Sequence, residues 1–447
     1  MRVFYEEPVS NSDGPLIIFS MNARFLDAAR SGDYGFGVVD FVLNGASAFA
    51  SKRRLGGILA YRRDDDIKKP FSRNWPGGDF PTRELIFSFK NRPEDVQSAL
   101  IHAIDVLTRA STHRHTEDVA LFHQSNTLLP YTPPSLPFLV THHGPFAEEI
   151  VRIFGKHFAA RAFQGGQGKL EHLLAAQAAG LEHLKTAPLG AAIEISKVQD
   201  SILRNYGIPS TKIFRTPPPL PDFELQENTP SQNTDQGFYF NEPFHIITAA
   251  ARVDEFKNLP FFVQEMNAAF QQGNVDRITL AVGRDDEHNA REALFQGFLP
   301  GLRPLVQLSA RLPHTDLLSL LKAEAGKAVF VFTSRYETFG LTPFEAMLCG
   351  MATLIPDLEE HLGIAEFVAP PQRFVLEPAG LAARIAALRS EDIAALGKHQ
   401  HSFARRFSGR EAFVRAVDEA LAAVRGHRPT PTQGTSNRER RERSATV

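Results

Sequence analysis

The sequence predicts an α/β protein built from two doubly wound halves. Short apolar segments typical of buried parallel strands alternate with longer segments whose apolar residues recur at helical spacing. At 447 residues the chain is long for one domain, and about two domains are expected. A stretch rich in Pro, Asn, Gln and Thr, from 216 to 237, separates two such alternating regions. We therefore expect two parallel sheets, each covered by helices.

Composition and charge are those of an ordinary globular protein. Hydrophobic residues make up 43% and charged residues 22%, and the net charge of −2 gives no general attraction to nucleic acid. The single cysteine, Cys349, excludes an intramolecular disulfide and a multi-cysteine metal site. The N-terminus lacks a signal-peptide stretch, and no apolar run approaches the ~20 residues that span a bilayer. We expect a cytoplasmic protein with no nucleic-acid partner and no transmembrane segment; peripheral membrane contact is left open.

The first half contains a glycine-rich loop at 31–37, between its first predicted strand and first predicted helix. Gly35 and Gly37 start the pattern of a dinucleotide fingerprint, but Asp40 stands where a third glycine is needed. We interpret the loop as backbone that approaches a phosphate, with an ordinary tight turn as the alternative. The strands of this half are predicted at 15–20, 57–61, 119–122 and 137–141, and its helices at 38–52 and 93–109.

The second half repeats the alternation. Its strands are predicted at 244–248, 277–282 and 328–332. The predicted organisation is a first domain at 1–215, an interdomain linker at 216–240, a second domain at 241–408, an amphipathic C-terminal helix at 409–426 and a disordered tail at 427–447. We expect the linker to be an exposed connection, because its residues favour turns and loops.

The segment 334–347 carries the strongest functional signal. It follows a predicted strand and leads into a predicted helix, and such junctions are where α/β proteins bind ligands. We expect Thr342 to be the N-cap and Pro343 the first helical residue, which makes Glu345 either a capping-box residue or an acceptor for sugar hydroxyls. Glu337 precedes the helix and has no capping role. The sequence leaves both interpretations of Glu345 open.

The string from Glu337 to Gly350, Glu-Thr-Phe-Gly-Leu-Thr-Pro-Phe-Glu-Ala-Met-x-x-Gly, resembles the donor-site signature of the family 4 retaining glycosyltransferases. The resemblance implies the GT-B fold, in which two Rossmann-like doubly wound domains face each other across a cleft. It also implies that the helix at 409–426 crosses back onto the first domain, the acceptor side. The expected activity is transfer of a sugar, expected to be a hexose, from a nucleotide diphosphate sugar to a small-molecule or glycan acceptor. No metal or other cofactor is expected.

The resemblance also gives roles to the residues of this string. It implies that Glu345 binds the ribose of the donor. It implies that Glu337, with the backbone amides of Phe339, Gly340 and Leu341, holds the sugar and its phosphate. In this interpretation the glutamates bind the donor and are not an acid–base pair.

Two further segments resemble parts of the same family's site. Arg252 and Lys257, followed by Asn258, match an Arg-x-x-x-x-Lys-Asn pattern after the first strand of the second half. Both cations would stabilise the leaving nucleoside diphosphate. The segment 141–144, Thr-His-His-Gly, resembles a Thr-x-His-Gly pattern that puts His143 beside the transferred sugar.

The remaining donor-side residues are assigned by their positions in the pattern. The resemblance places Gly35 and Gly37 near a phosphate, and Arg311 and Leu312 in the segment that contacts the nucleobase. Asp285 stands where the family's Val-Gly-x-Gly turn has a glycine, which leaves the role of this turn open.

Other interpretations remain. His123 either lines the acceptor side or is a structural histidine. A glycoside hydrolase is disfavoured because a helical spacer from Glu337 to Glu345 would rise ~12 Å, whereas paired catalytic carboxyl groups lie ~5–9.5 Å apart. The resemblance implies instead a retaining transferase with a front-face reaction, in which the leaving phosphate oxygen takes the acceptor proton. A sugar phosphorylase on the same fold and a non-catalytic nucleotide-sugar-binding protein are the remaining rivals.

Overall fold

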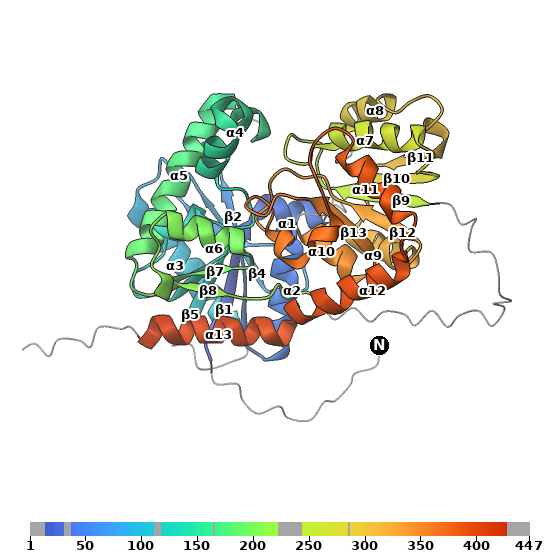
Figure 1. Ribbon diagram of the computed structural model, residues 1–447. Coiled ribbons are helices and arrows are strands. Elements are labelled where there is room, and N and C mark those ends of the chain that lie inside the picture. Colours follow the sequence, from blue (N-terminus) through green and yellow to red (C-terminus); the bar gives the residue numbers. More distant parts are fainter. Residues whose placement is uncertain are drawn as a thin grey trace, which may run out of the picture.

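The protein folds into two α/β halves that lie side by side (Figure 1). This computed structural model describes residues 14–30, 37–110, 118–163, 166–221, 244–284 and 287–426. Each half is built on its own sheet, whose central strands are buried and whose edge strands β3 (Phe71–Asn74), β8 (Ile213–Arg215) and β11 (Val306–Ser309) are partly exposed. The predicted fold class, two doubly wound sheets, is confirmed.

The first sheet has eight strands in the order β3-β4-β2-β1-β5-β6-β7-β8. All neighbours are parallel except β3 and β4, which are antiparallel. Each strand predicted in this half is present. The strands are β1 Leu16–Asn22, β2 Leu55–Arg63, β3 Phe71–Asn74, β4 Thr82–Phe87, β5 Val119–His123, β6 Phe138–Val140, β7 Gly190–Glu194 and β8 Ile213–Arg215.

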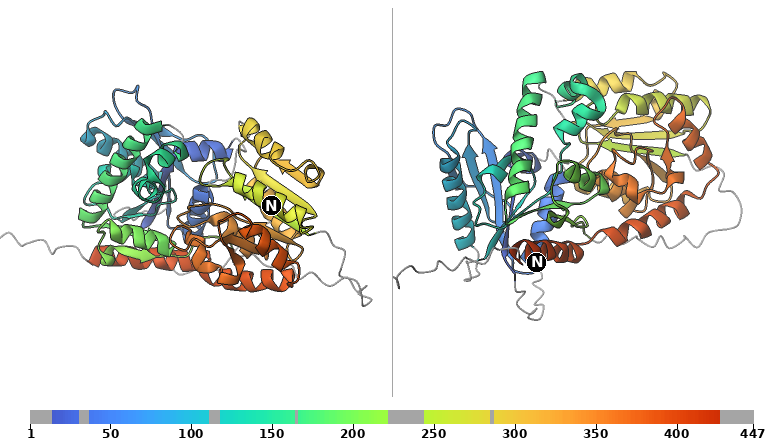
Figure 2. Two further views of the ribbon diagram at one scale, coloured as in Figure 1. Left: turned by 45° about the horizontal axis from the view of Figure 1, so that its top comes forward. Right: turned by 60° about the vertical axis from the view of Figure 1, so that its left-hand side comes forward.

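Helices cover both faces of the first sheet (Figures 1 and 2). The helices are α1 Ala23–Arg30, α2 Gly37–Ser51, α3 Pro93–Ala110, α4 Ala147–Ala162, α5 Gly166–Thr186 and α6 Lys197–Asn205, with short 3-10 turns η1 Asn126–Tyr131 and η2 Ser210–Lys212. The helices predicted at 38–52 and 93–109 correspond to α2 and α3. In the parts of the chain that the structure describes, no helix is long and apolar enough to cross a membrane.

The second sheet is fully parallel, with the order β11-β10-β9-β12-β13-β14. Its strands are β9 His245–Ala250, β10 Arg277–Val282, β11 Val306–Ser309, β12 Ala328–Val331, β13 Ala352–Pro356 and β14 Arg373–Phe374. Its helices are α7 Leu259–Gln271, α8 His288–Gln296, α9 His314–Ala323, α10 Leu341–Leu348, α11 Gly380–Leu388 and α12 Ile393–Ala404, with short 3-10 turns η4 Arg303–Leu305, η5 Gly363–Phe367, η6 Pro370–Gln372 and η7 Arg405–Phe407.

The strand order of the second sheet creates a ligand-binding crevice. Its first strand, β9, lies between β10 and β12, so the chain winds to one side of β9 and then to the other. The loops that follow β9 and β12 therefore run in opposite directions and leave a crevice outside their carboxyl ends, where doubly wound sheets bind ligands. The segments that contain Arg252 and Glu337 follow these two strands.

The last helix, α13 Arg410–Gly426, lies against the first half and not the second (Figures 1 and 2). Phe413 is fully buried and stacks on Phe122 of the first sheet with ring centroids 5.9 Å apart. Arg54, itself buried, makes a bidentate ion pair with Asp418 at 2.8 and 2.6 Å. The apolar face and the flanking ion pairs of α13 thus attach the end of the second half to the first.

The expectation that the linker is exposed is wrong for its first five residues. Residues 216–220 are mostly buried, whereas an exposed connection was expected from 216 onward. Leu220 is 1% exposed and belongs to the main core, and the carbonyl of Pro218 accepts a hydrogen bond from the Gly409 amide at 3.3 Å. A proline-rich stretch has few amide donors to satisfy, so it can be buried at low cost beside α13. Most of the remaining linker and the tail at 427–447 lie outside the described residues.

Candidate active site

The loop between β12 and α10 begins its helix earlier than predicted. Gly340 is the N-cap, in the left-handed conformation with φ 101°, and Leu341 is the first helical residue. A Cβ at Gly340 would lie 3.1 Å from Ile364, so both the backbone conformation and the space favour glycine. The predicted N-cap, Thr342, and the predicted first helical residue, Pro343, are therefore each two residues too late.

This helix start decides between the two interpretations of Glu345. With Gly340 as the cap, Glu345 lies too far along α10 for a capping box, in which the glutamate is three residues after the cap. Its side chain is nearly buried and accepts a hydrogen bond from Nε2 of His314 at 2.9 Å. The carboxylate thus belongs to the cleft and not to the helix end.

Glu337 forms an ion pair with Lys257, which joins two of the predicted site residues. The two side chains are only about one-fifth exposed, at 22% and 18%. The hydroxyl of Ser334 donates to the same Glu337 oxygen at 3.4 Å, and the Glu337 amide donates to the His361 carbonyl at 2.9 Å. The loop therefore holds its carboxylate directly beside a cation.

Arg252 has its own carboxylate partner in the turn after β9. Asp254 lies 3.1 Å from the Arg252 guanidinium and accepts from the amides of Phe256 and Lys257, both at 3.1 Å. Burial raises the pKa of Asp254, against the charges of Arg252 and Lys257. This internal carboxylate folds the turn so that both predicted cations lie at the carboxyl end of β9.

His143 lies where the two halves meet. Its Nε2 is 2.7 Å from Oε1 of Gln124, and its ring packs edge-on against Phe41 at 4.5 Å between centroids. The Thr338 hydroxyl, from the donor-site loop, donates to the His143 carbonyl at 3.3 Å. Burial, with a smaller effect of neighbouring His142, lowers the pKa of His143 to about 3, so the ring is neutral near pH 7.

The neighbouring histidines are structural. His123 is fully buried between the hydroxyls of Ser20, at 2.6 Å, and Thr132, at 3.2 Å. His142 is nearly buried, is hydrogen-bonded to Asn126 and packs against Phe146. Burial lowers the pKa of each ring to about 3. The structural interpretation of His123 therefore replaces an acceptor-side role.

A cleft that opens to solvent lies between the halves at the carboxyl ends of β9 and β10. Its floor is made of small side chains from these strands, which leaves room for a ligand. It is lined by Gly37, Asp40, Ala249, Ala250, Ala251, Ala281, Arg311, Leu312, His314, Leu317, Leu341, Thr342 and Glu345. The list includes five of the predicted donor-binding residues, from two different halves.

The other predicted donor-binding residues have different places. Phe339 is 2% exposed and packs its ring against Phe344 and Phe367, so only its backbone can face a ligand. Gly37, which does line the cleft, approaches α10 closely, since a Cβ there would lie 2.5 Å from Leu341. Gly35 and Asp285 lie outside the described residues.

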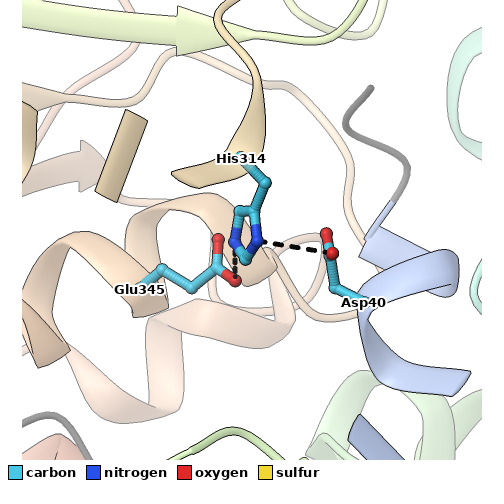
Figure 3. A group of neighbouring side chains, drawn as sticks. All are labelled: Asp40, His314 and Glu345. Carbon is cyan, nitrogen blue, oxygen red and sulfur yellow. Dashed lines mark hydrogen bonds and ion pairs between the residues drawn. The ribbon is translucent and has the colours of Figure 1, made fainter. Parts of the chain in front are cut away.

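The sequence did not predict Asp40 and His314 as site residues. His314 begins α9 and lies between the two halves: its Nε2 faces Glu345 and its Nδ1 faces Asp40 of α2, at 3.4 Å (Figure 3). Asp40 was noted only as the residue that breaks a glycine pattern. A signal for His314 was its place two residues after Leu312, in the segment expected to contact the nucleobase.

These three side chains are also the one group, among the described residues, whose ligand atoms lie close enough to hold a metal ion, within 4.8 Å of one another. The two ring nitrogens of His314 face different carboxylates. A single ion could bind only one of these nitrogens. The observed arrangement fits a protonated imidazole between two carboxylates better than a metal site.

Two doubly wound sheets with a cleft between them, and cations beside the carboxyl ends of the second sheet, form the GT-B architecture. Residues 244–391 match the family model described as Glycosyl transferases group 1. This match lies within the second half, and it confirms the enzyme class predicted from the sequence, a glycosyltransferase.

Solved structures share this fold over nearly the whole chain. A sucrose-phosphate synthase from Thermosynechococcus elongatus has a TM-score of 0.61 at 15% identity, covering 93% of this chain and 100% of that one. A glycosyltransferase from Rickettsia africae has a TM-score of 0.60 at 13% identity, covering 92% and 99%. HepE of Anabaena, in complex with UDP and glucose, has a TM-score of 0.59 at 14% identity, covering 92% and 100%. A comparison with curated proteins finds no match.

Proposed function

We propose that the protein is a retaining glycosyltransferase of family 4 that moves a hexosyl group from a nucleotide diphosphate sugar to an acceptor hydroxyl. The cleft carries this proposal: it gathers Gly37 from one half and Arg311, Leu341 and Glu345 from the other at the carboxyl end of a doubly wound sheet. HepE of Anabaena, which has the same fold, was solved with UDP and glucose.

The nucleoside part of the donor occupies the cleft beside Glu345. The small alanine side chains of β9 and β10 accommodate the base, with Arg311 and Leu312 beside it. The Glu345 carboxylate accepts hydrogen bonds from the ribose hydroxyls. Glu345 lies on the second turn of α10, whose N-terminus points its unpaired amides toward the phosphates.

The diphosphate binds at the turn after β9 and at the start of α10. Lys257 is paired with Glu337 in the structure, and Arg252 with Asp254. An incoming diphosphate brings two phosphoryl groups to these cations, while the sugar hydroxyls donate to Glu337. Fixed cations in a partly closed cleft stabilise the charge that develops on the leaving phosphate.

In the reaction, the bond between the sugar C1 and the β-phosphate oxygen breaks, and a bond forms between C1 and the acceptor oxygen on the same face. The acceptor proton moves to the departing phosphate oxygen, so the products are the glycoside and a nucleoside diphosphate. His143, neutral near pH 7, orients the sugar by a hydrogen bond and adds no charge. The donor configuration at C1 is retained.

The test is a thermal-shift screen of nucleotide sugars, followed by mass analysis of products with a panel of sugar and glycan acceptors. We expect one nucleotide sugar to stabilise the protein and to yield a glycoside plus a nucleoside diphosphate. A product with the inverted anomeric configuration would contradict the retaining mechanism. Turnover only with inorganic phosphate would identify a phosphorylase, and binding without any turnover would identify a binding protein.

A further inference from the structure

An ionic bridge crosses the cleft between the halves. His314 of the second half faces Asp40 of the first half through Nδ1 and Glu345 of its own half through Nε2 (Figure 3). We propose that His314 is a positioning residue which, in its protonated form, aims the Glu345 carboxylate at the donor ribose and ties α2 to the donor cleft, so that donor binding is lost when His314 loses its proton. This inference rests on the proposed function.

When both carboxylates are ionised, the geometry favours the protonated ring. The distances are 2.9 Å from Nε2 to Oε1 of Glu345 and 3.4 Å from Nδ1 to Oδ1 of Asp40. Both partners are carboxylates, which only accept hydrogen bonds when ionised, and only the imidazolium has an N–H on both nitrogens. A neutral ring would leave one carboxylate facing a bare nitrogen, so the bridge forms fully only in the charged state.

Partial burial strengthens the electrostatic interactions between the three side chains of this bridge. The side chains of Glu345, Asp40 and His314 are 6%, 19% and 21% exposed. With the imidazolium in place the three groups carry a net charge of at most −1, whereas the neutral ring leaves two carboxylates to repel each other. Two such charges in a site with little water are costly, so loss of the proton favours separation of Asp40 from Glu345.

The titration behaviour agrees with the geometry. Burial alone would lower the pKa of His314, but the hydrogen bond to Glu345 and the charges of Glu345 and Asp40 outweigh it and raise the pKa to about 9. Burial also raises the pKa of Asp40 to about 7, against the charge of His314. Nearby, Arg311 lines the same cleft and stays charged, and burial raises the pKa of the Cys349 thiol to about 12. The ion pair between His314 and Glu345 is therefore present below about pH 9 and lost above it, and Asp40 joins it as an ionised carboxylate between about pH 7 and pH 9.

The bridge leaves Glu345 able to bind a ligand. An ionised carboxylate has two oxygens, so Glu345 can accept from His314 at one oxygen and from a ribose hydroxyl at the other. Asp40, His314 and Glu345 all line the cleft in which we place the nucleoside. Holding one oxygen fixes the rotamer of the carboxylate before the donor arrives, which reduces the entropy lost on binding.

The first test measures binding of UDP, GDP and ADP by calorimetry between pH 7.5 and pH 10. For the nucleotide that binds, we expect wild-type affinity to fall about tenfold at pH 10, since a group with pKa near 9 is then about nine-tenths deprotonated. His314→Gln should bind more weakly at pH 7.5 and lack that loss. Asp40→Asn should shift the loss to lower pH, because one of the two charges that hold the proton is gone.

The control is His102→Gln, on the exposed face of α3, which should follow the wild type at every pH. The two proteins differ only at residue 314, so the difference between their two curves isolates His314. An equal alkaline loss of affinity in His314→Gln would overturn the inference and leave the proposed function standing. Absence of nucleoside diphosphate binding by the wild type at any pH would overturn the proposed function as well.

A second measurement needs no ligand. Histidine-selective isotope labelling and NMR titration of the whole protein should show one ring that titrates near pH 9, and this signal should be missing in His314→Gln. In Asp40→Asn the same ring should titrate at a lower pH. A His314 ring that titrates at or below its ordinary pKa of about 6.5 would overturn the bridge.

Discussion

Glu337 and Glu345, eight residues apart in the chain, have different partners and different tasks. Glu337 pairs with Lys257, and neither residue lines the cleft, whereas Glu345 lines it and is nearly buried and hydrogen-bonded to His314. Neither arrangement pairs the two carboxylates as acid and nucleophile. The single-residue contacts thus agree with donor binding by both glutamates, and they favour transfer over hydrolysis.

Glu337→Gln should lower the transfer rate about 100-fold, as expected when one group that stabilises the transition state is lost. Stability should fall by only about 1 kcal/mol or less, because Gln can still accept a hydrogen bond from Lys257. Initial rates and thermal unfolding measure the two effects. The matched control is Glu411→Gln. Glu411 lies on α13 and forms an ion pair with Lys52.

Glu411→Gln also removes one carboxylate from an ion pair but should keep the full rate. A Glu337→Gln enzyme with a wild-type rate would remove Glu337 from the proposed site.

At the scale of elements, the junction between β12 and α10 shows what the sequence could predict. An apolar run and the helix-favouring residues after it are local signals, and both elements are present. The N-cap was predicted two residues too late because Thr and Pro are common at helix starts. The observed N-cap, Gly340, has a left-handed backbone and lies too close to Ile364 for a larger residue. That contact comes from a distant part of the chain.

The bridge of Asp40, His314 and Glu345 was missed for the same reason. Its members come from α2, α9 and α10, and only tertiary folding brings them together. By contrast, Arg252, Lys257 and Glu337 follow two strands that neighbour each other in the sheet, so the strand pattern places them at one edge. Motifs at strand ends were predictable from the sequence, and contacts between helices of different halves were not.

Gly340→Ala should destabilise the protein by about 1–2 kcal/mol and weaken nucleotide binding. The left-handed backbone strains any L side chain, and the added Cβ would lie 3.1 Å from Ile364. The matched control is Gly273→Ala, which has φ 71° but open space around the new Cβ.

Gly273→Ala should lose stability through backbone strain alone and keep nucleotide affinity. Thermal unfolding and nucleotide calorimetry of both variants separate the two contributions. Equal nucleotide affinity in Gly340→Ala and wild type would show that the start of α10 does not hold the donor.

At the scale of the whole molecule, the two halves are joined at several points around the cleft. Phe256 of the second half packs against Phe158 of α4, with centroids 5.8 Å apart, and the Ser196 hydroxyl donates to the Thr338 carbonyl. The helix α13 and the buried stretch 216–220 add a further connection behind the cleft. These contacts hold the acceptor half against the donor loop that contains Glu337.

Removal of divalent metals should leave transfer unchanged. Arg252, Lys257 and the amides at the start of α10 provide the positive charge that a diphosphate needs. Initial rates with EDTA, and after adding Mg²⁺ or Mn²⁺ back, should agree within about twofold. Loss of activity in EDTA that Mn²⁺ restores would contradict this, and Asp40→Asn would then show whether the ion binds at the Asp40, His314 and Glu345 group.

The most direct test of the proposed donor site is a crystal structure of the protein with the nucleoside diphosphate that binds in the screen. We predict ribose hydroxyls within hydrogen-bond distance of Glu345, and the diphosphate at Arg252, Lys257 and the first amides of α10. His314 should still lie between Asp40 and Glu345. A nucleotide bound outside the cleft, or one whose ribose does not touch Glu345, would contradict the account.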